Sequence, residues 1–341
     1  MMKGSAMQVV NVHGPGDVRL DDVAAPQAGE HDAIIRIEAC GICGTDLAYI
    51  REGGLPHAPS PMPIGHEAAG TVLAVGPKVD QINVGQRVLV NPMGSTAVIG
   101  NGGPEGAFTQ QLLVREAERS LLIVPQEVSS EVAALAEPLA VAQHGVNRSE
   151  AKAGEKVAVF GCGPIGLGAV LWLADRGVTD IVAIDVHEER LKLAAALGAR
   201  ATIRADQEDV AARLGELHGS RDLYGRQAVL TNAYIDAAGA PNILPDVVAM
   251  ANSHARLVVI AAYRKPVPLD LSTMLMSEMT IKTSMGYPDE LKDVLASLPR
   301  LTDKLQHFVS HRLPFDDVIE GFRIAARPDS AKVMIHFSDT L

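Results

Sequence analysis

The stretch Gly161-Cys162-Gly163-Pro164-Ile165-Gly166 decides the fold of this chain. Its glycines have the G-x-G-x-x-G spacing; a short apolar run at residues 157–160 precedes it, and a helical pattern at residues 165–176 follows it. In this spacing the first glycine permits a tight turn, the second lets the backbone approach a pyrophosphate, and the third lets the helix pack closely against a sheet. The helix N-terminus offers N–H groups and a partial positive charge to the phosphates. The stretch therefore predicts a dinucleotide-binding loop between a strand and a helix.

An acidic residue follows the loop at the distance that such sites require. Asp185 stands 24 positions after Gly161 (185 − 161), directly after a second apolar run at residues 181–184. We expect its carboxylate to accept hydrogen bonds from the adenosine ribose and to repel a 2′-phosphate, so NAD is favoured over NADP. The alternative is a helix cap in front of Glu188. We interpret Cys162, inside the loop, as a small apolar filler.

Strands and helices alternate after this loop, whereas roughly the first 130 residues are β-rich. Such alternation predicts a parallel sheet with right-handed crossovers, so the fold class is α/β. A helix is predicted at residues 131–144, which Pro138 kinks or divides. The other predicted strands are residues 33–39, 68–75, 87–91, 228–235, 257–262, 308–312 and 332–337, and the other predicted helices are residues 188–197, 245–251, 288–297 and 315–325.

The composition is that of a globular protein. The length of 341 residues fits about two domains, and 47% hydrophobic with 21% charged residues predicts packed cores. The net charge of −11 and the pI near 5.5 argue against nucleic acid and anionic membranes as partners. No run reaches the roughly 18 apolar residues of a membrane span, and residues 1–11 lack the apolar core of a secretory signal. Three cysteines exclude a disulfide scaffold and fit the reducing cytoplasm.

Metal-binding residue types gather in the β-rich part. Cys40-Gly41-Ile42-Cys43-Gly44-Thr45-Asp46 is followed by Gly65-His66-Glu67. The first stretch alone could be half of a zinc ribbon or a redox pair, but no second cysteine pair exists for a ribbon. A lone His66 would be a core histidine. Cys43, His66 and Glu67 together, ahead of a dinucleotide loop, favour Zn²⁺ with one open position. Such a metal would help an alcohol lose its proton, and the alkoxide could expel hydride onto nicotinamide.

These motifs resemble those of the zinc-dependent medium-chain dehydrogenases/reductases of the sorbitol, threonine and butanediol dehydrogenase type. The resemblance covers essentially the whole chain. Its motifs are residues 41–46, 63–70, 84–88 and 137–140, together with the glycine loop.

The resemblance implies a role for each candidate residue. Cys43 and His66 would be zinc ligands, with Glu67 and Glu137 either binding directly or exchanging with water. Thr45 would relay the substrate proton through its hydroxyl, and Asp46 would orient His66 from behind. Cys40 is not a ligand in this pattern. The implied cofactor-binding residues are Gly161, Gly163, Pro164, Ile165, Gly166, Asp185 and Arg190, with Arg190 along the adenosine ribose.

Three departures from the family pattern change what we expect. Residues 92–108 contain no cysteine, so the second, structural zinc of many relatives should be absent, leaving one zinc per chain. Ala48 stands where some relatives carry a histidine that completes the proton relay. Met285-Gly286-Tyr287 replaces the Phe-Arg-Tyr of sorbitol dehydrogenases, whose arginine helps to hold a polyol. That loss weakens a sugar-alcohol assignment.

The expected architecture is a doubly wound Rossmann domain at residues 140–284 inserted into a β-rich, GroES-like catalytic domain at residues 1–139 and 285–341. Substrate and zinc would lie in the cleft between the two domains. The expected activity is NAD-dependent oxidation of a secondary alcohol, diol or polyol to a ketone by a homodimer or homotetramer. Two alternatives stay open, namely a zinc-free NADPH-dependent quinone or enoyl reductase on the same fold, and a non-catalytic cofactor-binding homologue.

Overall fold

The computed structural model describes residues 7–327 and 329–338. The chain forms two compact units. Unit 1 takes the residues up to Glu137 and those from Leu291 onward, and unit 2 takes Pro138–Glu290. The chain therefore leaves unit 1, builds unit 2 as one continuous segment, and returns to unit 1.

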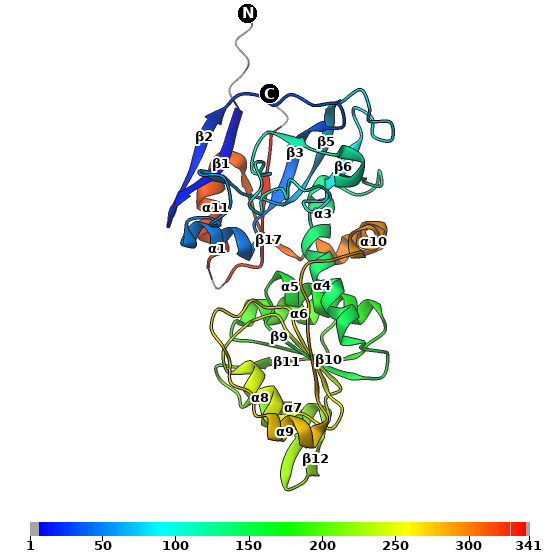
Figure 1. Ribbon diagram of the computed structural model, residues 1–341. Coiled ribbons are helices and arrows are strands. Elements are labelled where there is room, and N and C mark those ends of the chain that lie inside the picture. Colours follow the sequence, from blue (N-terminus) through cyan, green and yellow to red (C-terminus); the bar gives the residue numbers. More distant parts are fainter. Residues whose placement is uncertain (1–6, 328, 339–341) are drawn as a thin grey trace, which may run out of the picture. The chain divides into compact units, whose positions relative to one another are not determined.

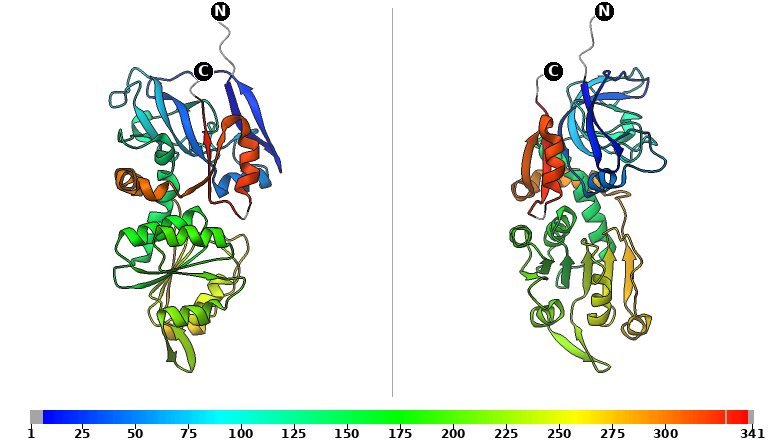
Figure 2. Two further views of the ribbon diagram at one scale, coloured as in Figure 1. Left: turned by 180° about the vertical axis from the view of Figure 1, so that it is seen from behind. Right: turned by 90° about the vertical axis from the view of Figure 1, so that its left-hand side faces the viewer.

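Unit 2 is built on a six-stranded parallel sheet with the order β11-β10-β9-β14-β15-β16. Numbered within the sheet, this order is 3-2-1-4-5-6, that of a Rossmann fold. Figure 2 shows helices on both faces of this sheet. Its strands are β9 (Lys156–Phe160), β10 (Asp180–Asp185), β11 (Ala201–Arg204), β14 (Ala233–Asp236), β15 (Arg256–Val259) and β16 (Thr280–Thr283). Its helices are α5 (Pro164–Asp175), α6 (Glu188–Leu197), α7 (Val210–His218), α8 (Ile243–Met250) and α9 (Leu271–Ser277), and α4 (Ala136–Ser149) begins at the boundary between the units.

The strand predicted at residues 228–235 is wrong in one respect. Its apolar run belongs to two strands, β13 (Arg226–Val229) and β14, of which only β14 joins the parallel sheet. β13 pairs in antiparallel register with β12 (Ser220–Leu223), and this hairpin projects from the unit (Figure 1). Tyr224 and Gly225 both have positive φ at its tip, which is the geometry of a two-residue hairpin turn. A tyrosine in that position gives no sequence signal for such a turn.

Unit 1 is β-rich. Its larger sheet has the order β17-β18-β3-β5-β6-β8, with β7 also paired to β3, and a smaller sheet has the order β2-β1-β4. Figure 1 shows the C-terminal strand region beside β3, far from it in sequence. The strands are β1 (Met7–Gly14), β2 (Asp17–Val23), β3 (Ala33–Gly41), β4 (Met62–Pro63), β5 (Glu67–Val75), β6 (Arg87–Val90), β7 (Gln111–Val114), β8 (Leu121–Ile123), β17 (Val309–Pro314) and β18 (Lys332–His336). The helices are α1 (Gly44–Glu52), α2 (Ala117–Ser120), α3 (Ser130–Ala134), α10 (Glu290–Leu305) and α11 (Val318–Ala325), the last preceded by a 3₁₀ turn, η1 (Phe315–Asp317).

Two predicted helices have different bounds in the structure. The helix predicted at residues 131–144 is divided into α3 and α4 at Leu135, so that Pro138 falls in the first turn of α4, where no backbone N–H is needed. The helix predicted to end at residue 297 continues through Pro299 as α10. Leu298, Leu301 and Leu305 are all buried beyond or beside that proline, and their burial outweighs the lost hydrogen bond.

None of the helices in the described part of the chain is long and apolar enough to cross a membrane.

Candidate functional site

Three donor side chains meet in unit 1. Cys43 is the N-cap residue of α1, His66 precedes β5, and Glu67 is the first residue of β5. One donor atom from each lies within 4.8 Å of the donors of the other two. His66 and Glu67 are buried, whereas Cys43 is half-buried. The structure thus brings together the three residues that the sequence singled out for a metal.

Two glycines let these side chains approach one another. Gly65 has φ +97°, and a Cβ there would lie 2.8 Å from the backbone nitrogen of Phe108. Gly41 pairs with Glu67 across β3 and β5, and a Cβ at Gly41 would lie 2.1 Å from Glu67 Oε2. A side chain at Gly41 would displace Glu67, and one at Gly65, next to His66 in the chain, would collide with Phe108.

Asp46 connects the segment that carries Cys43 with the segment that carries His66 and Glu67. Its Oδ2 accepts a hydrogen bond from the N–H of Cys43 at 2.9 Å, and its Oδ1 accepts one from the N–H of Gly65 at 3.2 Å. Burial raises the pKa of the Asp46 carboxyl, although His66 and both N–H groups act to lower it. Burial would lower the pKa of His66, but the charges of Asp46 and Cys43 raise it well above its ordinary value.

The donor set suits zinc. A thiolate, an imidazole and a carboxylate are the ligands of catalytic zinc sites, and magnesium or calcium sites use oxygen donors instead. His66 Nδ1 is buried without a hydrogen-bond partner among the described residues and lies 3.6 Å from Asp46 Oδ1. A histidine ring with one nitrogen near a carboxylate and a ring nitrogen within 4.8 Å of a cysteine sulfur has the arrangement of a metal-binding histidine. The residues present therefore fit the metal.

Sequence reasoning missed Lys332. This lysine is the first residue of β18 and is only 1% exposed. Its Nζ donates to both carboxylate oxygens of Glu67, at 2.6 and 2.7 Å, and to the carbonyl oxygen of Ile42 at 2.9 Å. Burial acts to lower the pKa of Lys332, but the charges of Glu67, Cys43 and Glu137 and the hydrogen bond to Glu67 together raise that pKa. The third donor of the cluster is thus held by a buried counter-charge from the far end of the chain.

Thr45 and Glu137 lie near the cluster without joining it. Thr45 is half-buried in the first turn of α1, and its N–H donates to Cys43 Sγ at 3.5 Å. Glu137 is buried in the first turn of α4, and its charge acts to raise the pKa values of both His66 and Lys332. Among the described residues, however, Glu137 is not in the compact donor group. The relay role of Thr45 and the ligand role of Glu137 stay predictions.

The glycine loop of unit 2 has an open helix N-terminus. Gly163 is the N-cap residue of α5 and supplies no side-chain cap, and Pro164 begins the helix. A Cβ at Gly166 would lie 1.7 Å from the carbonyl oxygen of Gly161, so only glycine fits there. A Cβ at Gly163 would meet no other atom within 4 Å, so the space above the loop is open. The third glycine therefore maintains the fold of the loop, and the second leaves room for a ligand.

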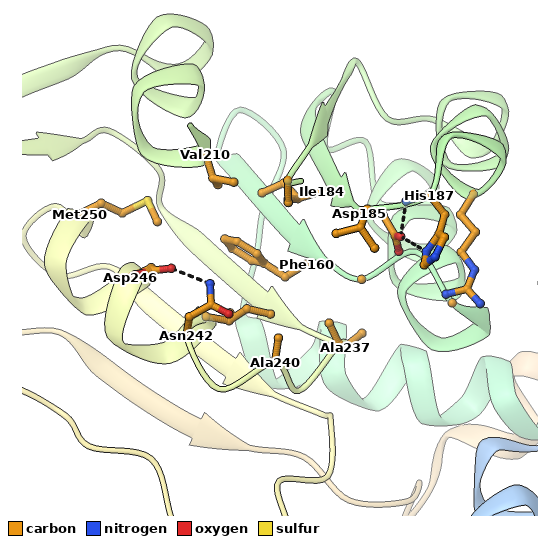
Figure 3. A pocket seen from close by; sticks show the side chains of 17 residues that line it. Phe160, Ile184, Asp185, His187, Val210, Ala237, Ala240, Asn242, Asp246 and Met250 are labelled. Carbon is orange, nitrogen blue, oxygen red and sulfur yellow. Dashed lines mark hydrogen bonds and ion pairs between the residues drawn. The ribbon is translucent and has the colours of Figure 1, made fainter. Parts of the chain in front are cut away.

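A cavity of about 420 Å³ opens beside this loop (Figure 3). Gly161, Gly163, Asp185 and Arg190 line it, as do Phe160, Ile184, His187, Val210, Ile243 and Met250. Pro164 and Ile165 do not line this cavity in the structure. The walls are mostly apolar. Polar side chains lie in two places, Asp185, His187 and Arg190 on one side and the hydrogen-bonded pair Asn242 and Asp246 on the other (Figure 3). An apolar cavity with a few polar groups is the composition expected of a small-molecule pocket.

Asp236 is a second residue that the sequence did not reveal. It is fully buried at the end of β14, and its Oδ1 accepts hydrogen bonds from the N–H groups of Ala238 and Gly239, both at 3.0 Å. Its Oδ2 accepts one from the hydroxyl of Tyr263 at 2.7 Å. These bonds fix the turn after β14, and Ala237, Ala238 and Ala240 from that turn line the cavity.

Comparison with known proteins identifies the family. Residues 29–126 match the model of the alcohol dehydrogenase GroES-like domain, and residues 164–300 match that of the zinc-binding dehydrogenases. Sorbitol dehydrogenase of Rattus norvegicus is 30% identical, over 98% of this chain and 96% of that protein. The chain belongs to the zinc-binding medium-chain dehydrogenases/reductases. The fold class predicted from the sequence is confirmed.

Solved structures of this family have the same fold as this chain. The crystal structure of 2R,3R-butanediol dehydrogenase from Bacillus subtilis has a TM-score of 0.86 at 30% identity and covers 97% of this chain and 99% of its own. A zinc-binding dehydrogenase from Sinorhizobium meliloti 1021, bound to NADP, has a TM-score of 0.85 at 25% identity and covers 97% and 99%. Family membership implies zinc and a nicotinamide cofactor. These relatives do not favour the zinc-free reductase or the non-catalytic homologue.

Proposed function

We propose that this chain oxidises a secondary alcohol, diol or polyol to the ketone with transfer of a hydride to NAD. The observation that carries the proposal is the group of Cys43, His66 and Glu67 donors within 4.8 Å, in a chain that also holds an open glycine loop and a nucleoside-sized cavity. The names of the relatives, a sorbitol and a butanediol dehydrogenase, support the substrate class.

The chain's own residues would bind and orient the reactants. Cys43 and His66 would hold the zinc, which when bound acts as a Lewis acid that eases loss of the alcohol proton. Asp46 keeps His66 and Cys43 in register through its two backbone hydrogen bonds. Thr45, one residue before Asp46 on α1, would receive the substrate proton at its hydroxyl. No side chain at Ala48 extends that relay, so the proton would pass to water or to cofactor hydroxyls.

Metal analysis tests the proposed site. We expect about one zinc per chain, because residues 92–108 lack a second ligand set. Cys43→Ser should lose most of the zinc and nearly all activity, since a serine hydroxyl stays protonated near neutral pH and is a poor substitute for thiolate. Cys40→Ser is the matched control, because Cys40 is buried in β3 outside the donor group. Two zincs per chain, or full activity after chelation, would contradict the proposal.

We also propose that NAD is preferred over NADP. The support is Asp185, whose carboxylate lines the cavity and would face a 2′-phosphate with like charge. Asp185→Ser combined with Val186→Arg should narrow or reverse the preference, measured as the ratio of kcat/KM for the two cofactors. Equal efficiency of the native protein with both would contradict this role.

Within this class we propose small secondary alcohols or vicinal diols over hexitols. Gly286 stands where polyol-binding relatives carry arginine, so neighbouring hydroxyls find no bidentate partner there. A site that hydrogen-bonds a substrate hydroxyl strongly rejects analogues that lack this hydroxyl. An apolar wall distinguishes substrates that differ by one methylene by only about 1–3 kcal/mol. Kinetics with sorbitol, 2,3-butanediol and a simple secondary alcohol test this, and a tenfold advantage for sorbitol would refute it.

We further propose a homo-oligomer in a reducing compartment such as the cytoplasm. β16 ends the parallel sheet with one free edge, and the adjacent α9 exposes Leu271 and Leu275, 71% and 76% exposed. A second copy of the chain would cover this face. Leu275→Glu should shift the molecular mass measured by light scattering towards the monomer, and an unchanged mass would count against this face. The reducing compartment is supported by three free cysteines, one of them a ligand candidate.

A further inference from the structure

One residue of the cavity has no assigned role. His187 lies between β10 and α6, lines the cavity beside Asp185, and has a side chain that is 33% exposed (Figure 3). Its Nδ1 lies 2.9 Å from Asp185 Oδ1. The inference drawn from this pair rests on the proposed function, because it concerns how the same cavity recognises the ribose of the cofactor.

Asp185 is already nearly saturated with hydrogen bonds. Its Oδ2 accepts from the N–H of Cys162 at 2.6 Å, and its Oδ1 accepts from the N–H and the Nδ1 of His187, both at 2.9 Å. A carboxylate has about four acceptor positions, so about one remains. An adenosine ribose presents two neighbouring hydroxyls. Asp185 alone therefore cannot accept both, and a second acceptor is needed.

The tautomer of His187 supplies that acceptor. An ionised carboxylate can only accept, so the proton between the two side chains lies on Nδ1. In the neutral ring Nε2 then carries a lone pair and no proton. We propose that His187 Nε2 accepts one ribose hydroxyl while Asp185 Oδ2 accepts the other, which makes His187 a specificity-determining residue for the 2′ position of the cofactor.

This arrangement discriminates by hydrogen-bond polarity as well as by charge. A 2′-hydroxyl has a proton to donate to Nε2, whereas a 2′-phosphate presents acceptors to a lone pair. The charged groups around His187 are Asp185 on β10, Glu188 and Arg190 on α6, and Arg204 and Asp206 at the end of β11. Arg204 is bound to Asp206 at 2.9 Å and lies 3.6 Å from Glu188, so this group of one cation and two anions carries a net negative charge.

Calorimetric binding of ADP-ribose and 2′-phospho-ADP-ribose tests the proposal without turnover. At pH 8 the native protein should bind ADP-ribose more tightly than 2′-phospho-ADP-ribose. His187→Asn is the matched control, because an amide can donate to Asp185 and accept from ribose. It should keep ADP-ribose affinity within about threefold of the native value.

Two further variants sharpen the result. His187→Leu removes the acceptor and should weaken ADP-ribose about tenfold, equal to about 1.4 kcal/mol. His187→Arg should bind the 2′-phosphate more tightly than the native protein does at pH 8. A histidine-ring nitrogen NMR spectrum at pH 8 should show the His187 proton on Nδ1, with the signal identified by its absence in His187→Asn.

The possible results distinguish the role of His187 from the proposed cofactor site. If the native protein binds ADP-ribose but His187→Leu binds it normally, or His187→Asn weakens it as much as His187→Leu does, the role of His187 is wrong and the dinucleotide site stands. If ADP-ribose does not bind the native protein at all, both the inference and the proposed cofactor site are wrong.

Discussion

At the scale of single residues, Lys332 has the largest predicted effect on stability. It is buried with Glu67, and its Nζ makes three hydrogen bonds, two of them to the Glu67 carboxylate. Removing one partner of a buried ion pair leaves an uncompensated charge, which typically costs about 3–5 kcal/mol. We therefore expect Lys332→Met to lower the free energy of unfolding of the metal-free protein by that amount, measured by urea denaturation.

A double variant distinguishes charge from packing in this prediction. Glu67→Gln combined with Lys332→Met removes both charges while keeping similar volumes, and it should recover most of the lost stability. If the double variant is as unstable as Lys332→Met alone, the cost comes from packing around β18 and the electrostatic explanation is wrong.

At the scale of elements, the loop before α5 separates stability from binding. Gly163 has φ −70°, and its added Cβ meets nothing within 4 Å, so Gly163→Ala should leave the melting temperature almost unchanged. The methyl group would instead occupy the space that a pyrophosphate must approach, and ADP-ribose affinity should fall by tenfold or more. Gly166→Ala would place a Cβ 1.7 Å from the Gly161 carbonyl oxygen and should lower the melting temperature itself. Equal effects of the two variants on both measurements would contradict these separate roles.

The elements also show which structural features a sequence reveals. The loop at residues 161–166 could be predicted, because the glycines that define it are close together in the sequence. The parallel sheet could be predicted because strand and helix patterns alternate along the chain. The β12–β13 hairpin was not, because its apolar residues continue into β14 without a turn signal. The candidate ligands could be found because their residue types are unusual. Lys332 could not, because only the pairing of β18 with β3 brings it to Glu67, and a lysine at the start of a strand is ordinarily exposed.

At the scale of the whole molecule, the two units should lose stability over different ranges of acid pH. In unit 2, His218 is buried between Thr231 and Asp180, and burial lowers its pKa from 6.5 to about 4. Its unfolded form takes up a proton first, so stability falls as the pH falls from 6.5 to 4, by about 2–3 kcal/mol. In unit 1, hydrogen bonds from His336 and Arg312 lower the pKa of Glu131 from 4.5 to about 2. Its contribution is complete above pH 4.5 and is lost between pH 4.5 and 2.

Denaturant midpoints measured from pH 7 to pH 3 test this order. Fluorescence of Trp172, the single tryptophan, reports on unit 2, and far-ultraviolet circular dichroism reports on both units. His218→Asn should flatten the dependence of unit 2 stability on pH between 6.5 and 4, whatever its stability at pH 7. Glu131→Gln should leave that range unchanged and act only below pH 4.5. If both units unfold in a single transition whose midpoint neither substitution changes, other groups control acid unfolding.

The pairing of β18 with β3 has a consequence for biosynthesis. Unit 2 is one continuous segment and has all of its strands once Glu290 has been made, whereas unit 1 also needs β17 and β18, which follow unit 2 in the chain. During translation the segment that carries Cys43, His66 and Glu67 is made first, and the partner that neutralises Glu67 is made 265 residues after it. Tight metal binding should therefore require translation beyond residue 332, and a nascent chain stalled before that residue should hold a folded nucleotide domain and no tightly bound zinc.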